Sequence, residues 1–154
     1  MRLDSGKECL KCDFCSSLYF PEANADGVRV FGDPGEDACP VCDVVLVHAA
    51  IGGERVFYCE NCRGMLVPMG SFLVILNDLR ARRGDAVGIA SPPDWNDLNR
   101  HIDCPRCRVE MDTHPYGGGG GVIIDTCSEC SVIWLDASEM ARMARVPDRA
   151  AVQY

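Results

Sequence analysis

Three features of this 154-residue sequence predict a small α+β fold in which metal-binding cysteines hold β-hairpins together. Ten of the eleven cysteines form five Cys-x-x-Cys pairs, part of the chain is repeated, and each repeat ends in a helix-like segment. A two-residue gap lets both thiolates turn toward one tetrahedral metal ion, so two such pairs complete a site. We therefore predict tandem metal-bound hairpins, each followed by a helix.

The second repeat carries the most specific signal. Its two pairs are nineteen residues apart, and the segment between them contains a five-glycine tip at 117–121. Strand-like runs at 109–114 and 122–126 flank the tip, so a hairpin would carry one pair to the other. This spacing is typical of a zinc ribbon. The predicted zinc ligands are Cys104, Cys107, Cys127 and Cys130.

Other residues around this hairpin follow a familiar pattern. The pattern comprises Cys104-Pro-x-Cys107, the glycine tip, Cys127-x-x-Cys130, and Trp134-Leu-Asp136 followed by Glu139. In these positions the chain resembles the bacterial zinc-ribbon family of the transcription factor IIB type. Ser131 and Val132 stand where that family has a glycine. The resemblance implies a small zinc-binding module, and the family name is a sequence label rather than a biochemical role.

A first copy of the pattern precedes the second. When Cys62 is aligned with Cys130 without gaps, residues 65–67 fall on residues 133–135, although only sixteen residues separate the two cysteine pairs of this copy. Pro68 stands where the family has the aspartate seen as Asp136. Internal repetition is stronger evidence than one motif. The predicted ligands of the first ribbon are Cys39, Cys42, Cys59 and Cys62, and the resemblance covers residues 39–80 and 104–147.

The N-terminal segment contains a fifth pair, Cys12 and Cys15, and we expect strand-like runs at 18–20 and 28–31 to form a further hairpin. Five pairs make two four-cysteine sites and leave one pair over. If the repeats define the sites, Cys12 and Cys15 form a third metal site that is partial or shared. Four other side chains could complete it within the chain: Cys9, His48, His101 and His114.

A rival pairing joins Cys12 and Cys15 to Cys39 and Cys42 across twenty-three residues. The matching motifs are Cys12-x-x-Cys15, Tyr19-x-Pro21-Glu22, Asp26-Gly27-Val28 and Cys39-Pro-x-Cys42. With this pairing the segment resembles rubredoxin, although Ser16 stands in place of a glycine and no tryptophan precedes the second pair. Rubredoxins bind one iron and carry electrons, so this resemblance implies an electron carrier.

A helix is predicted at 71–83, ending at Gly84. Its apolar residues form more than one stripe, because Leu73 and Val74 point away from the face that holds Phe72, Ile75, Leu76 and Leu79. The helix is therefore either buried on two sides or carries a binding surface. A capping box, Asp136-Ala-Ser-Glu139, predicts a second helix, which gives Glu139 a structural role.

The predicted organisation has five parts. They are an N-terminal knuckle and hairpin (1–38), ribbon 1 with its helix (39–83), a linker (84–103), ribbon 2 with its helix (104–148) and a tail (149–154). Glycine, serine and a Pro-Pro pair at 84–93 mark the linker, and residues 94–100 could add one helical turn before ribbon 2. Each ribbon is short, so zinc would supply folding energy on the order of 10 to 16 kcal/mol per site.

Composition and charge limit the function. We expect a cytoplasmic protein with reduced thiols, because no apolar signal region and no run of eighteen apolar residues is present. The formal charge is −8 with neutral cysteines, and each site of four thiolates and one zinc ion adds −2, giving about −12. This balance disfavours nucleic acid, which requires Lys and Arg to neutralise phosphates.

The residues form no pattern typical of catalysis. There is no nucleophile paired with a base, no phosphate-binding loop and no open three-ligand metal motif, so we predict that the protein is not an enzyme. The leading hypothesis is a zinc-binding module that binds another protein, with a homodimer as one form of that interaction. The rivals are the rubredoxin-like electron carrier and a DNA-binding or transcription-associated adaptor. No membrane association is predicted.

Overall fold

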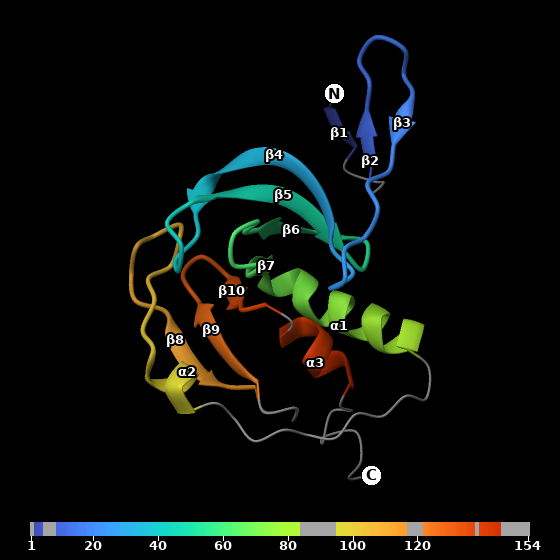
Figure 1. Cartoon of the computed structure of the whole chain (residues 1–154). Coiled ribbons are helices and arrows are strands. Elements are labelled where there is room, and N and C mark those ends of the chain that lie inside the picture. Colours follow the sequence, from blue (N-terminus) through green and yellow to red (C-terminus); the bar gives the residue numbers. More distant parts are fainter. Residues whose placement is uncertain (1, 5–8, 84–94, 117–121, 138, 146–154) are drawn as a thin grey trace.

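The computed structural model describes residues 2–4, 9–83, 95–116, 122–137 and 139–145 (Figure 1). The predicted glycine tip, the 84–93 part of the linker and the C-terminal tail lie outside these residues. The described chain folds into two antiparallel sheets and three helices, which confirms the predicted α+β class. The predicted domain boundaries stay a prediction.

The N-terminal sheet has three short strands, β1 (Arg2–Asp4), β2 (Cys9–Lys11) and β3 (Leu18–Tyr19), in the order β1-β2-β3. The expected hairpin between 18–20 and 28–31 is wrong. Leu18 pairs with Lys11, whereas the later run belongs to β4 and pairs in the other sheet. The Cys12–Cys15 knuckle itself turns the chain, so the strands on either side of it form the hairpin.

The second sheet contains seven antiparallel strands in the order β4-β5-β6-β7-β10-β9-β8. Ribbon 1 supplies β5 (Val45–Ile51), β6 (Glu54–Tyr58) and β7 (Met65–Pro68). Ribbon 2 supplies β8 (Asp112–Pro115), β9 (Ile123–Cys127) and β10 (Val132–Leu135). Strand β4 (Arg29–Ala38) covers the outer edge of ribbon 1.

The two ribbons meet in the middle of this sheet, where β7 pairs with β10. Leu66 lies opposite Trp134, with Val67 opposite Ile133 on one side and Met65 opposite Leu135 on the other. Leu66 and Trp134 occupy the same position in the aligned repeats. The pairing therefore relates the two ribbons by an approximate twofold axis at this point, as in a symmetric dimer contained in one chain.

Helix α1 (Met69–Arg83) follows β7, and α3 (Glu139–Arg145) follows β10, so the helices obey the same approximate symmetry. They lie side by side against one face of the large sheet (Figure 1). A single apolar core runs between helices and sheet. Its members from both ribbons include Val47, Met65, Val67, Ile75, Leu76, Ile124, Ile133, Leu135, Met140 and Met143.

Helix α1 begins two residues before the predicted start, at Met69. Phe72, Ile75 and Leu76 are buried in the shared core, as their spacing indicated. Leu73 and Val74 remain 59% and 49% exposed. Their apolar area is thus on the surface of the described chain rather than buried on a second side.

The start of α3 shows half of the predicted capping box. The backbone N–H of Asp136 donates to the Glu139 carboxylate at 2.6 Å. The Asp136 side chain instead accepts hydrogen bonds from Arg100 and Trp134, outside the helix. Burial raises the pKa of Glu139 to about 8, and the nearby Asp136 charge adds to this effect. Glu139 therefore caps the helix in a buried setting, consistent with the structural role expected for it.

The short predicted turn before ribbon 2 is present as α2 (Trp95–Asn99). No helix in the described part of the chain is both long enough and apolar enough to cross a membrane.

Candidate metal centres

The structure gathers eight cysteines into two groups of four. Within each group the sulfur atoms all lie within 4.8 Å of one another. One group comes from ribbon 1 and the other from ribbon 2, as the repeat alignment predicted. The groups are Cys39, Cys42, Cys59 and Cys62, and Cys104, Cys107, Cys127 and Cys130.

The distances between sulfurs fit a tetrahedral metal ion. Cys39 Sγ and Cys62 Sγ are 3.7 Å apart, and so are Cys107 Sγ and Cys127 Sγ. With zinc–sulfur bonds of about 2.3 Å, the edge of a tetrahedral site measures about 3.8 Å. A disulfide would require about 2.05 Å. The donor set and its size therefore fit Zn²⁺, and the chain has two zinc sites.

A common backbone turn places the sulfurs. In every Cys-x-x-Cys pair the residue after the second cysteine has a left-handed backbone conformation, although none of them is glycine. These residues are Ser16 (φ 57°), Asp43 (60°), Arg63 (65°), Arg108 (62°) and Ser131 (54°). Such a conformation is costly for a residue with a Cβ atom, so its repetition indicates a required geometry. Ser131 thus forms the turn for which the resembling family uses glycine.

Backbone hydrogen bonds hold these turns. In the first knuckle of ribbon 1, the Asp43 N–H donates to the Cys39 carbonyl at 2.9 Å, and the Cys39 N–H donates to the Val44 carbonyl at 2.7 Å. The N–H of Cys42 points at the Cys39 sulfur, 3.3 Å away. Such N–H groups stabilise a thiolate, which is the form that binds a metal.

Without a metal, burial makes two thiols of ribbon 1 hold their protons more tightly. Burial raises the pKa of Cys39 to about 11 and also raises the pKa of Cys62. A divalent metal must displace these protons, so zinc affinity increases with pH. The assignment of all eight thiolates as ligands stays a prediction.

Both zinc sites lie on the sheet face opposite the helices. On β10, Ile133 and Leu135 belong to the core under the helices, whereas Val132 and Trp134 belong to a second core around the cysteines. Leu66 from β7 joins that second core. The sheet therefore separates a helical layer from a layer of metal sites, and Trp134 is fully buried in the latter.

A polar network braces ribbon 2 beside this layer. The Arg100 guanidinium donates to both carboxylate oxygens of Asp136, at 3.1 and 2.7 Å, and to Asp125 at 3.2 Å. Asp125 is only 1% exposed and also accepts a hydrogen bond from Thr113 at 2.5 Å. Burial raises the pKa of Asp125, while Thr113 and Arg100 act in the opposite direction. The Trp134 indole donates to Asp136 at 3.2 Å.

The remaining candidate ligands lie apart from both groups. Among the described residues, neither Cys12 nor Cys15 joins Cys39 and Cys42, which is the arrangement that a rubredoxin-like site would need. Cys9 is fully buried in β2 rather than at the surface. The three histidines also lie outside the metal groups: the His48 ring is tilted by 48° against the Phe57 ring, His101 pairs with Glu110 at 2.9 Å, and His114 lies in β8.

Comparison with protein families supports the geometry of ribbon 2. Residues 103–146 match the family described as transcription factor zinc-finger. Over this segment the chain is similar to that family. The matched residues include the second four-cysteine group, β8 to β10 and most of the Arg100 network. No curated protein and no solved structure matches the chain.

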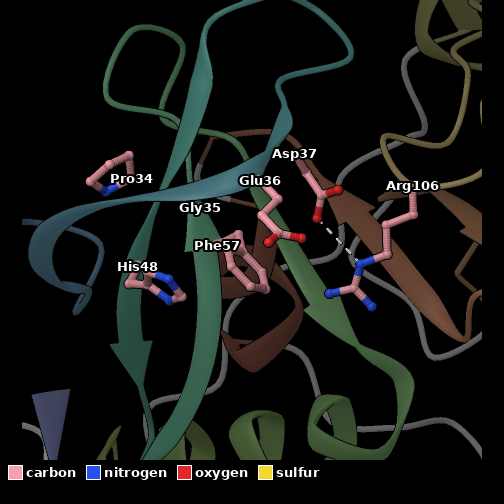
Figure 2. A pocket seen from close by; sticks show the side chains of 7 residues that line it. All are labelled: Pro34, Gly35, Glu36, Asp37, His48, Phe57 and Arg106. Atoms are coloured by element: carbon pink, nitrogen blue, oxygen red, sulfur yellow. Dashed lines mark hydrogen bonds and ion pairs between the residues drawn. The ribbon is translucent and has the colours of Figure 1, made fainter.

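Sequence reasoning missed a pocket of about 530 Å³ between the two ribbons (Figure 2). Arg106, from the first knuckle of ribbon 2, reaches across to β4 and donates to Asp37 at 3.3 Å. Its guanidinium also lies 5.6 Å from the centre of the Phe57 ring of β6. The remaining lining residues are Pro34, Gly35, Glu36 and His48. The sequence signal was small: Arg106 stands where the first copy has Val41.

Proposed function

We propose that this protein is a zinc-stabilised, non-catalytic binding module whose partner is another protein, and that a segment of the partner enters the pocket between the ribbons. The observation that carries the proposal is that both ribbons build this pocket. Arg106 comes from ribbon 2, whereas the aromatic wall comes from Phe57 of ribbon 1. A pocket of this size is in the range of ligand-binding sites.

The chemistry of the pocket indicates what would bind. Phe57 is half-buried and offers an apolar ring, with the His48 ring centred 5.1 Å away. Asp37 is already paired with Arg106, whereas Glu36 is exposed and points toward the space in front of Phe57 (Figure 2). A segment that places an apolar side chain on Phe57 and a Lys or Arg near Glu36 would complement both groups.

The shape of β4 supports the proposal. Its pairing with β5 shifts register on both sides of Pro34, so bulges interrupt the ladder beside the pocket. Bulges re-aim side chains and discourage unspecific pairing of an edge strand. The second shift, between Pro34 and Ala38, spans Glu36 and Asp37, which line the pocket.

A protein partner suits the charge of the molecule better than nucleic acid does. The formal charge of −8 becomes more negative when zinc is bound by thiolates, and nucleic-acid binding depends on neutralising phosphates. The proposed setting is the cytoplasm, where the cysteines stay reduced.

Selection from a displayed random-peptide library on the zinc-loaded protein tests the proposal. We expect peptides that pair an apolar residue with Lys or Arg. Their affinity should fall about tenfold, or about 1.4 kcal/mol, with Glu36→Lys. Glu60→Lys makes the same charge change on an exposed zinc knuckle and should leave affinity unchanged. Equal effects of the two substitutions, or selected peptides that still bind Phe57→Ala at full affinity, would show that the pocket is not the binding site.

A further inference from the structure

The knuckle at Cys12 and Cys15 has the backbone of the four zinc knuckles in the ribbons. The Ser16 N–H donates to the Cys12 carbonyl at 3.0 Å, and the Cys12 N–H donates to the Ser17 carbonyl at 2.9 Å. The same two bonds occur at Cys39, Cys59 and Cys104, with lengths between 2.7 and 2.9 Å. Ser16 also has the left-handed conformation found after each of those pairs. This turn is therefore built to present two thiolates to a metal.

The two cysteines of this knuckle are more exposed than the ribbon pairs, each of which has one buried and one intermediate cysteine. The knuckle forms the tip of the β2–β3 hairpin, which points away from the large sheet (Figure 1). Cys15 is exposed, and the Phe14 side chain between the two cysteines is fully exposed. The following residues Leu18, Tyr19 and Phe20 are 40–54% exposed. An apolar tip of this kind next to two thiols is open to a partner from outside the chain.

Two cysteines provide only half of a tetrahedral zinc shell. In the described part of the chain, the groups able to hold a metal contain neither Cys12 nor Cys15. The eight cysteines of the ribbons are already gathered in two complete sets. Cys9 is buried in β2, and the histidines lie elsewhere in the fold.

We propose that Cys12 and Cys15 form an intermolecular zinc site with the same two residues of a second copy of this chain. A twofold axis through the metal lets each copy supply two thiolates, and a tetrahedron is compatible with that symmetry. The two sites within the chain are built in the same way, from one knuckle facing another. A second copy is the partner that fits best, because it brings the same two cysteines and the same exposed Phe14.

This inference does not depend on the pocket proposed above, which lies in the other sheet. Zinc binding would release the thiol protons to solvent and involves no change in the oxidation state of zinc or sulfur. The stability of the dimer would come mainly from the metal, because the tip offers little area compared with a standard protein interface.

Two measurements on the same sample test the site: the zinc content per chain and the molecular mass in solution. The protein is purified under reducing conditions and saturated with zinc. The wild-type protein should be a dimer at tens of micromolar by sedimentation, with about two and a half zinc ions per chain. The variant with Cys12→Ser and Cys15→Ser should be a folded monomer with about two zinc ions per chain. Its far-UV circular dichroism should match the wild type, since the ribbons retain their metal.

Three further variants separate the alternatives. Cys9→Ala should leave the dimer and its zinc content unchanged. Cys15→His, which keeps a zinc-binding side chain, should retain dimerisation that Cys15→Ala loses. A monomer with three zinc ions per chain would overturn the proposal, because the site would then be completed within one chain. A wild-type monomer with two zinc ions per chain would overturn it equally, including the case in which Cys12 and Cys15 form a disulfide.

Discussion

Gly64 allows the two ribbons to approach each other closely. A Cβ atom at this position would lie 2.3 Å from the Cζ2 atom of the Trp134 ring, which is far inside van der Waals contact. The repeats are complementary here, because the aligned partners of Gly64 and Trp134 are Val132 and Leu66. One ribbon provides space and the other a large side chain. At this contact the two ribbons therefore depart from their approximate symmetry, because their aligned side chains differ in size.

We predict that Gly64→Ala destabilises the zinc-loaded protein by about 1 to 3 kcal/mol, because the buried indole has no room to move away. Chemical denaturation at constant zinc concentration measures the change in the free energy of unfolding. Gly70→Ala is the matched control, since nothing lies within 4 Å of the added Cβ and the residue is helical. That control should be neutral or stabilising by up to about 1 kcal/mol. Equal stability of the two variants would contradict the tight contact.

At the scale of elements, Arg100 joins the end of α2 to β9 and β10. It makes ion pairs with Asp125 and with Asp136, and the two carboxylates lie on different segments of ribbon 2. Asp136 in turn positions the Trp134 indole and lies at the start of α3. The Arg100 side chain therefore links three elements around the buried Asp125 carboxylate.

We predict that Arg100→Met destabilises the protein by about 3 to 5 kcal/mol, because it leaves Asp125 buried without its cation. The comparison is Arg82→Met, which removes an ion pair between the exposed Arg82 and the partly exposed Asp78, one turn apart on α1, and should cost no more than about 1 kcal/mol. Urea denaturation of both zinc-loaded variants measures the difference. An Arg100→Met effect as small as that of Arg82→Met would mean that the network contributes little to stability.

At the scale of the whole molecule, the ribbons share a sheet and a core. The β7–β10 pairing joins them, and the core below α1 and α3 takes side chains from both. Loss of zinc from one ribbon should therefore destabilise the other ribbon as well. Independent ribbons would instead unfold separately.

We predict that Cys59→Ser, which removes a ligand from ribbon 1, exposes Trp134 in ribbon 2. Loss of a site removes on the order of 10 kcal/mol of binding energy, comparable to the total stability of a typical domain. Tryptophan fluorescence in a Trp95→Phe background reports on Trp134 alone, because the chain has two tryptophans. In the Trp95→Phe protein that retains Cys59, removal of both metals by a chelator should give the same fluorescence of a solvent-exposed Trp134. Trp134 that stays buried in Cys59→Ser, at full zinc saturation of ribbon 2, would show that the ribbons are independent.

The sequence by itself determined the local chemistry. Cysteine spacing together with the internal repeat predicted which sulfurs meet, because a Cys-x-x-Cys turn and a hairpin are set by residues close together in the chain. Helix α1 was predicted to within two residues, and the repeat indicated that both units have the same architecture. The turn after Cys130 formed without glycine, and Ser131 adopts there the left-handed conformation that its side chain disfavours.

Only the tertiary structure decided how the units combine. The strand at 28–31 contains no feature that says which neighbour it will pair with, and it joined ribbon 1 as part of β4 instead of closing a hairpin with 18–20. The spacing of residues in the sequence predicts neither the pairing of Leu66 with Trp134 nor the position of Arg106 against Phe57. Each depends on contacts between segments far apart in the chain, where burial of apolar surface rather than local geometry selects the arrangement.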